Sequence, residues 1–328
     1  GNLFYLADNP YFEARDVWQT YRSYLAATEH PPKQTVEWAQ SYMARIRGSS
    51  PAYSNAAVAL EQSKFGFPGP AAGLRYLYNH ARYYRNDPTL PSIREKVIDV
   101  VRLKRNRARL RHMFAAPATI AGRDFVYFPL HYEPEIATLI LSQFDQRSVI
   151  DIVTRQMPLT WKLVVKEHPA MLGQRDPAFF EEIKRRYPNV VLIDPGVSSF
   201  LLASEARAVL TLNGTVTLET LILRKPAIFL SNARFGGFGL GTMTHDLINF
   251  GAVLSAALDN VPTDHELTAM LASIHRHCRR YEFAEPLGRP SVLDNGNIGA
   301  LADAVLDKLE FAQGVARTVP GKLRPAPA

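Results

Sequence analysis

From Phe125 onward, short β-rich runs alternate with amphipathic stretches, and this alternation constrains the fold more than any other feature of the sequence. The predicted strands cover residues 125–130, 161–165, 190–194, 208–212 and 226–230. The predicted helices lie near residues 145–157, 176–187, 198–206 and 215–224. Strands that alternate with helices in this way form a parallel sheet covered on both faces. We therefore predict an α/β fold with a Rossmann-like parallel sheet over residues 117–316.

The residues before this region have a different pattern. From Ala14 to about Phe114 the apolar residues recur at helical spacing, with Pro and Gly breaks such as Phe67-Pro68-Gly69-Pro70. We predict that residues 1–116 form a mainly helical N-terminal part. The Pro-rich residues 317–328 are predicted to be a disordered tail.

Length and composition limit the class of protein. The chain has 328 residues, 47% of them hydrophobic, which is enough for one large or two ordinary domains. No apolar run approaches the roughly 18 residues that span a bilayer, and the start lacks a signal-peptide pattern. Cys278 is the single cysteine, which excludes an internal disulfide and fits a reducing, cytoplasmic location. Because the chain begins with Gly1 and not Met, a preceding segment is left open.

The net charge of +7 comes from the first part of the chain. Residues 1–116 carry 17 Lys and Arg against 9 Asp and Glu, whereas residues 117–328 carry 21 against 22. Residues 102–111 hold six of these cations. This run can attract an anionic lipid surface or an anionic glycan, or it can be the solvated face of a helix. No nucleic-acid-binding motif accompanies the charge, so nucleic acid is not an expected partner.

Polar side chains follow four of the predicted strands, where a parallel sheet binds its ligands. The first strand is followed by Glu133 and Glu135, near His131. The later strands are followed by candidates for phosphate and nucleotide binding: Lys166, His168, Ser198, Ser199, Asn213, Gly214 and Thr215. Asp194, which follows the third strand, is with His131 the alternative catalytic group if neither glutamate acts. Because the carboxyl ends of parallel strands meet at one edge, we expect these side chains to converge there.

Gly214 and Thr215 open a predicted helix, and Glu219 follows Thr215 at the i, i+4 position. Free N–H groups at such a helix start favour phosphate, and Glu219 is placed to accept hydrogen bonds from ribose hydroxyls. In the alternative interpretation Thr215 only caps the helix and Glu219 only complements its dipole.

Lys166 and His168 together form a predicted phosphate clamp, with the lysine as a point charge and the imidazole as a hydrogen-bond donor. Taken singly, each has an ordinary alternative: a solvated charge at the end of a strand, and a ring bonded to the backbone. Glu133 or Glu135 is a candidate base or nucleophile for group transfer. The alternative is that both carboxylates are structural.

The order of the motifs resembles the bacterial capsule polysaccharide biosynthesis family, which includes capsule-type β-Kdo transferases. The resemblance covers about residues 120–235 and rests on Phe128-Pro129-Leu130-His131-Tyr132-Glu133-Pro134-Glu135, Lys166-Glu167-His168-Pro169, Asn213-Gly214-Thr215-Val216-Thr217-Leu218-Glu219 and Lys225-Pro226. It implies a GT-B-type glycosyltransferase whose nucleotide-sugar domain is this region. By the same resemblance Lys166, His168, Gly214, Thr215 and Glu219 bind the donor nucleotide, and Glu133 or Glu135 lies at the reacting carbon, with Glu135 ranked slightly ahead.

Two departures from the family pattern qualify these expectations. Asn213-Gly214-Thr215 stands where relatives often have a Ser/Thr-rich motif, and Glu135 stands where the Kdo transferases carry Asp. The donor, a CMP-Kdo-like nucleotide sugar or another, therefore stays open. Residues 1–116 lack the βαβ pattern of a GT-B acceptor domain, so we expect them to be a remnant of that domain.

The resemblance implies a transferase that acts in capsule or surface polysaccharide biosynthesis, on a glycan or lipid-linked glycan acceptor at the inner face of the membrane. No Asp-x-Asp motif is present, so neither a metal nor any other cofactor is expected. Two alternatives remain: a nucleotide-sugar epimerase, and a non-catalytic component of capsule assembly or export.

Overall fold

The computed structural model describes residues 2–4, 14–48, 74, 77, 78, 80, 82, 92–134, 142–212, 214, 216–231, 235–282 and 290–312. The chain divides into two compact units. The α/β unit contains residues 48–231 and 241–261, and the helical unit contains residues 1–47, 232–240 and 262–328.

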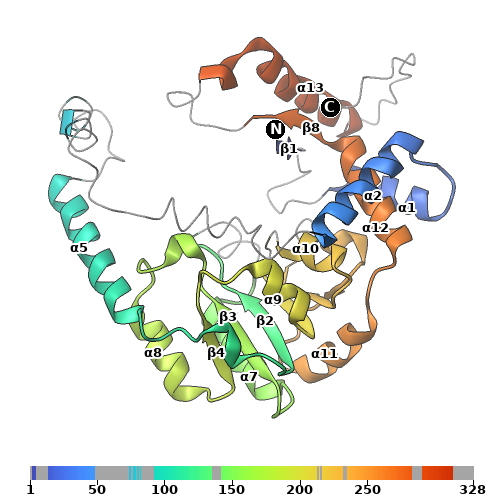
Figure 1. Cartoon of the computed structure of the whole chain (residues 1–328). Helices are drawn as coiled ribbons and strands as arrows, with labels where there is room; N and C mark the ends of the chain where they lie inside the picture. Colours follow the sequence, from blue (N-terminus) through green and yellow to red (C-terminus); the bar gives the residue numbers. More distant parts are fainter. Residues whose placement is uncertain are drawn as a thin grey trace. The chain divides into compact units, whose positions relative to one another are not determined.

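A six-stranded parallel sheet forms the centre of the α/β unit (Figure 1). Its strands are β2 (Phe125–Pro129), β3 (Lys162–Lys166), β4 (Val190–Ile193), β5 (Ala208–Thr211), β6 (Ala227–Phe229) and β7 (Thr242–Met243). The spatial order is β4-β3-β2-β5-β6-β7. The chain thus builds outward from β2 in one direction, then returns to β5 and builds in the other. This is the order of a doubly wound Rossmann sheet, with its switch point between β2 and β5.

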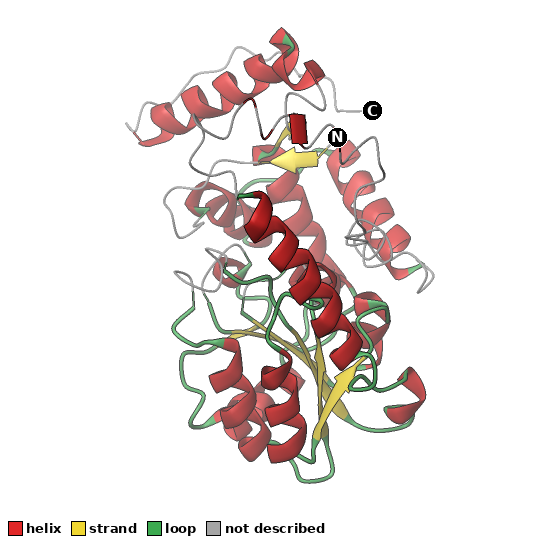
Figure 2. Cartoon of the chain, turned by 90° about the vertical axis from the view of Figure 1, so that its left-hand side faces the viewer, coloured by secondary structure: helices red, strands yellow, loops and turns green. Residues whose placement is uncertain are grey.

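Helices cover both faces of this sheet (Figure 2). They are α7 (Gln146–Gln156), α8 (Pro177–Arg186), α9 (Ser199–Glu205), α10 (Val216–Ile222) and α11 (Phe250–Asp259). Alternate residues of β2 enter two separate cores, because successive side chains of a strand point to opposite faces. Val126 and Phe128 pack in the core that includes residues of α7, α8 and α11, whereas Phe125 and Tyr127 pack in the core that includes residues of α9.

Helix α5 (Ile93–Leu110) precedes the sheet and belongs to the α/β unit. Its start is fixed by a capping box between Ser92 and Glu95. Near its other end the buried Asn106 donates from Nδ2 to the carbonyl of Gly173 at 3.0 Å. Gly173 has φ +87°, and a Cβ there would lie 2.7 Å from Cγ of Arg107. This contact therefore requires glycine on both conformational and steric grounds.

The helical unit brings together segments from distant parts of the chain. It contains α1 (Arg15–Leu25), α2 (Lys33–Arg47), α12 (Asp264–His277) and α13 (Asn295–Ala312), with β1 (Asn2–Phe4) paired antiparallel to β8 (Arg279–Tyr281). Helix α12 contacts both α1 and α2. The partly buried carboxylate of Asp16 in α1 accepts from Nζ of Lys308 in α13 at 2.7 Å and lies 3.4 Å from Nδ1 of His277. Short 3-10 helices complete the chain at Pro117–Thr119, Pro169–Met171, Gly236–Phe238 and Pro290–Leu293.

The predicted α/β fold is confirmed, and each of the five predicted strands and four predicted helices from Phe125 to Leu230 is present within a few residues of its expected bounds. The division into units differs from the expected boundaries at residues 116 and 316. Helix α5 joins the sheet, while residues 262–312 join the N-terminal helices. Packing between the two ends of a chain is a long-range property that local sequence pattern does not encode. The breaks at residues 67–70 and the tail 317–328 lie outside the described residues. Within the described part of the chain, no helix combines the length and the apolar character needed to cross a bilayer.

Candidate functional site at the strand-order switch point

The loops that follow β2 and β5 meet at the switch point of the sheet. The N–H of Gly214 donates to Oγ1 of Thr211 at 3.0 Å, which turns the chain immediately after β5. A Cβ on Gly214 would lie 3.3 Å from Cε1 of His131, in the loop after β2. Ligands of doubly wound sheets bind in the crevice at this position.

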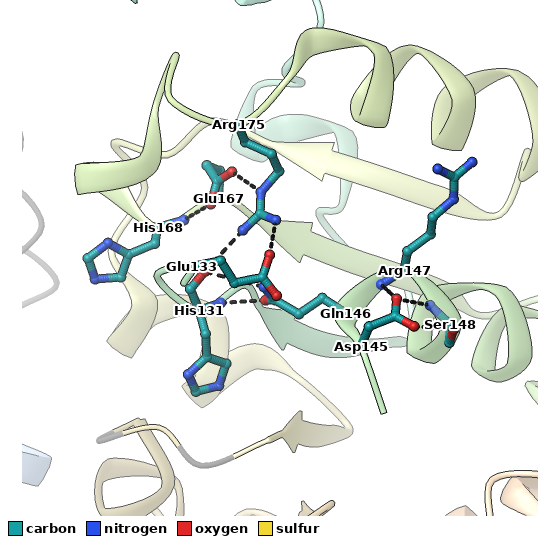
Figure 3. Close-up of polar contacts among 9 residues, drawn as sticks. All are labelled: His131, Glu133, Asp145, Gln146, Arg147, Ser148, Glu167, His168 and Arg175. Atoms are coloured by element: carbon teal, nitrogen blue, oxygen red, sulfur yellow. Dashed lines mark hydrogen bonds and ion pairs between the residues drawn. The ribbon is translucent and has the colours of Figure 1, made fainter. Parts of the chain in front are cut away.

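His131 is buried, and a hydrogen bond to a residue of α7 holds its backbone in place. Asp145 caps α7 by accepting from the N–H groups of Arg147 and Ser148, both at 2.9 Å. This places Gln146 at the start of the helix, where its Oε1 accepts from the N–H of His131 at 2.5 Å (Figure 3). Burial lowers the pKa of His131 to about 4, with smaller contributions from His168 and Arg175. The imidazole at the switch point is therefore neutral at pH 7.

Arg175 joins the loops after β2 and β3. Its guanidinium donates from Nε to Glu167 at 2.7 Å, from Nη1 to Glu133 at 2.5 Å and from Nη2 to the carbonyl of His131 at 3.0 Å (Figure 3). The Glu167 side chain is fully buried, and its second oxygen accepts from the N–H of His168 at 2.6 Å. Burial raises the pKa of Glu167, and the charge of Arg175 opposes this shift. The ring of Phe179 lies 5.0 Å below the guanidinium, a cation–π contact.

His168 presents one ring nitrogen to a hydrogen bond of its own loop. Its Nδ1 accepts from the N–H of Ala170 at 3.2 Å, so the neutral ring carries its proton on Nε2. Burial, followed by the nearby charge of Lys166, lowers the pKa of His168. The ring is thus a neutral donor at pH 7, with Tyr132 packed against it edge to face at 6.2 Å.

Lys166 lies within a second charged cluster between β3, α9 and α10. Its side chain is buried and donates from Nζ to Oγ of Ser199 at 2.8 Å, and the same oxygen accepts from the hydroxyl of Tyr127 at 3.1 Å. Burial lowers the pKa of Lys166 to about 8, against the stabilising charges of Glu219 and Asp194. Burial raises the pKa of Glu219, and Lys166 opposes that shift. Lys166 and Glu219 are therefore an electrostatically coupled pair.

The structure accounts for the other predicted residues as follows. Oγ of Ser198 accepts from the N–H of Leu201 at 3.4 Å and so caps α9. Asp194 accepts from the N–H of Gly196 at 2.7 Å, within its own turn. Glu135, Asn213 and Thr215 lie outside the described residues. The proposed roles of all these residues in binding or catalysis stay predictions.

Two residues that shape the site were not predicted from the sequence: Arg175 and Gln146. Neither directly follows a strand. Arg175 lies eight residues beyond Glu167 and 42 beyond Glu133, and only the folded loop brings the three together. The one available signal was the position of Gln146 directly after Asp145, a favoured N-cap residue. In the ranges that the structure describes, no group of three or more His, Cys, Asp or Glu side chains is arranged to hold a metal ion.

A doubly wound parallel sheet with loops that converge at its switch point defines a Rossmann-type α/β domain. Residues 123–281 match the family model described as capsule polysaccharide biosynthesis protein. This match lies over the same region as the resemblance seen in the sequence motifs and confirms that resemblance.

Several solved structures are similar at low identity. The β-Kdo 2,7 transferase of Thermosulfurimonas dismutans KpsC is 18% identical with a TM-score of 0.37, and the match covers 69% of each chain. Anabaena HepE in complex with UDP-glucose is 15% identical with a TM-score of 0.32, covering 64% of this chain and 52% of that one. The UDP-GlcNAc 2-epimerase of Neisseria meningitidis is 16% identical with a TM-score of 0.32, covering 66% and 53%. Similarity at this level does not assign an activity. No curated protein matches the chain.

Proposed function

We propose that this protein is a glycosyltransferase that uses a nucleotide-sugar donor in capsule or surface polysaccharide biosynthesis. One observation carries the proposal: the residues that match the capsule polysaccharide family include the whole crevice at the switch point of the sheet. That crevice contains a neutral histidine pair, a buried cation and two partly buried carboxylates. This chemistry suits a ligand with both a phosphate and a sugar.

The donor nucleotide binds, in this proposal, across the loops after β3 and β5. His168 donates from Nε2 to a phosphate, and N–H groups at the start of α10, next to Thr215, donate to the same group. Gly214, whose own N–H is bonded to Oγ1 of Thr211, turns the chain toward this group. Glu219 accepts from the ribose hydroxyls. Because the ammonium of Lys166 is buried against Ser199, it acts as a fixed positive charge behind the phosphate and beside Glu219. Ser198, Ser199 and Asn213 complete the proposed donor site.

The reacting sugar lies, in this proposal, beside the loop after β2. Glu133 or Glu135 is the proposed catalytic carboxylate, and Asp194 or His131 takes that place if neither is required. The leaving phosphate is stabilised by N–H groups and imidazole donors fixed before the reaction, which is the usual source of electrostatic catalysis.

The proposed acceptor is a glycan or lipid-linked glycan at the cytoplasmic face of the membrane. The cations of residues 102–111 lie on α5 and on the turn after it. Arg102 pairs with Asp99 and Arg109 pairs with Glu181, both in exposed positions. We propose that this segment contributes a peripheral contact with anionic lipid.

Titration with CMP, UDP and GDP tests the first step of the proposal. The sugar nucleotides of the base that binds are then incubated with and without an oligosaccharide or lipid-linked acceptor. Transfer of the sugar to the acceptor supports the proposed function. Interconversion of free sugar nucleotides would identify an epimerase instead, and absence of nucleotide binding would indicate a non-catalytic assembly component.

Two Gln substitutions test the catalytic carboxylate. Replacing the working residue, Glu133→Gln or Glu135→Gln, should nearly abolish transfer and leave nucleotide affinity unchanged, because the interaction is needed chiefly in the transition state. Glu205→Gln, which alters an exposed carboxylate at the end of α9, is the matched control. Full activity in both variants would exclude the pair.

A further inference from the structure

Arg175 faces two carboxylates, although one would be enough to balance its charge. Glu167 has a fully buried side chain and needs a cation, whereas the side chain of Glu133 is 29% exposed and can be solvated at this edge. A buried carboxylate without a partner is costly, so Glu167 alone explains why a cation is present. The bond to Glu133 is additional, and charge balance in the interior does not require it.

The guanidinium is held in one orientation before it meets Glu133. Glu167 fixes Nε, the carbonyl of His131 fixes Nη2 and the ring of Phe179 lies against its face. A planar guanidinium held at these points presents its remaining Nη1 donor in a single direction. That donor meets Glu133 in the loop after β2 (Figure 3).

We propose that Arg175 is a positioning residue that holds the carboxylate of Glu133 at the crevice, ready to face the sugar of the donor. This inference rests on the proposed function for its kinetic consequence. It also assigns Glu133 as a carboxylate that the fold orients. Groups that act on a reacting atom must be held within a narrow range of geometry, and a 1 Å displacement costs on the order of 100-fold in rate.

Kinetics of single and double variants test the role. Arg175→Met should lower kcat on the order of 100-fold, with KM for the donor and nucleotide affinity changed less than threefold. Arg175→Lys keeps the positive charge but lacks the planar guanidinium and its fixed N–H donors. Its kcat should therefore lie between those of wild type and Arg175→Met. The double variant Arg175→Met/Glu133→Gln should be no slower than Glu133→Gln alone, because Arg175 acts through Glu133. Additive losses, or full activity of a folded Arg175→Met variant, would overturn the proposal.

Removal of Arg175 leaves the buried carboxylate of Glu167 unpaired, which by itself can unfold the protein. A second variant removes this problem. Arg175→Gln/Glu167→Gln removes both buried charges together and should show the same loss of kcat. The control is Arg207→Met, which deletes an exposed ion pair with Asp124 in the same unit and should leave kcat unchanged.

Crystal structures of wild type and of the Arg175 variants decide the positioning role without any assay. The carboxylate of Glu133 should leave its place in the Met and Gln variants, and an unmoved carboxylate would overturn the inference. If wild type binds neither CMP, UDP nor GDP, the proposed function fails, and these structures still show whether Arg175 places Glu133.

Discussion

Two clusters of buried charge lie at the carboxyl edge of the sheet, and they differ in what they hold in place. In the first, Arg175 ties together two loops through Glu167 and Glu133. In the second, Lys166 is bonded to Ser199 and coupled to Glu219. In the first cluster Glu167 balances the charge of Arg175, and Glu133 is the second carboxylate. In the second cluster Glu219 is the carboxylate beside the ammonium of Lys166. Substitution of Glu219 should weaken nucleotide binding, whereas substitution of Glu133 should lower the rate of transfer and leave binding unchanged.

Glu219→Ala tests the binding half of the site. If the carboxylate accepts ribose hydrogen bonds, the variant should bind the nucleotide about 1–3 kcal/mol more weakly, because a hydrogen bond to a charged group is lost. Isothermal titration calorimetry with the preferred nucleotide measures the effect, with Glu205→Ala as the control on an exposed carboxylate. Equal affinity in a folded Glu219→Ala variant would remove Glu219 from the site.

The buried ammonium of Lys166 predicts a pH dependence of stability. Its pKa falls from 10.5 to about 8 in the folded state, so between those values the unfolded chain binds more protons. The cost of burying the charge is therefore fully present below pH 8 and is relieved as the pH rises toward 10.5. From pH 7 to pH 10 the free energy of unfolding of wild type should rise by about 2 kcal/mol relative to Lys166→Met. Urea unfolding of both proteins measures this difference, and a constant difference would contradict the shift.

At the scale of elements, two side chains of α5 hold the loop that contains Arg175 by hydrogen bonds. Asn106 holds the carbonyl of Gly173, and Nε of Arg107 donates to the carbonyl of Leu172 at 2.9 Å. These bonds fix the loop two residues before Arg175. The helix that precedes the sheet is thus part of the support of the candidate site.

Gly173→Ala should be strongly destabilising for this reason. The substitution combines a left-handed backbone with a Cβ 2.7 Å from Cγ of Arg107, and should cost about 2–4 kcal/mol. Gly122→Ala is the matched control: Gly122 has φ +69° with no atom within 4 Å of a Cβ, so it carries the backbone cost alone, about 1 kcal/mol. Chemical denaturation measures the loss of unfolding free energy in each variant. Equal losses would show that Arg107 of α5 moves away from the new Cβ at no energetic cost.

The central elements of the sheet were predictable because their signals are local. A run such as Phe125–Pro129 is buried on both faces and therefore reads as a continuous apolar strand. The approach of the loops after β2 and β5 followed from parallel topology alone. The partners of Arg175 did not, because they depend on where a loop folds back. The membership of α5 in the α/β unit and of α12 in the helical unit also depends on long-range packing, which periodicity within each helix does not specify.

At the scale of the whole molecule, a partly buried ion pair between Asp16 and Lys308 joins α1 to α13. Burial alone would raise the pKa of Asp16, but the hydrogen bonds from His277 and Lys308 hold it well below its ordinary value of 3.8. Because the folded-state pKa is lowered, this stabilisation is present above pH 3.8 and is lost as the pH falls below it.

Asp16→Asn should lower the free energy of unfolding by about 1–3 kcal/mol at pH 7, and the difference from wild type should shrink below pH 3.8. Urea unfolding at pH 7 and pH 3 measures both values. Lys33→Met, which removes an exposed pair with Glu37, should change stability by less than about 0.5 kcal/mol. A pH-independent loss in Asp16→Asn would assign the effect to packing instead.

The assembly of the helical unit from separate segments has a consequence for synthesis on the ribosome. Helices α1 and α2 are made well before α12, which packs against both: Arg47 and its partner Asp264 are 217 residues apart. At the usual speed of translation this interval lasts roughly 10–40 s. The strands β2 to β6 can pair during that time, whereas Val17, Trp18 and Tyr21 of α1 have no α12 to cover them. Helices α1 and α2 therefore wait through this interval before they can pack against α12.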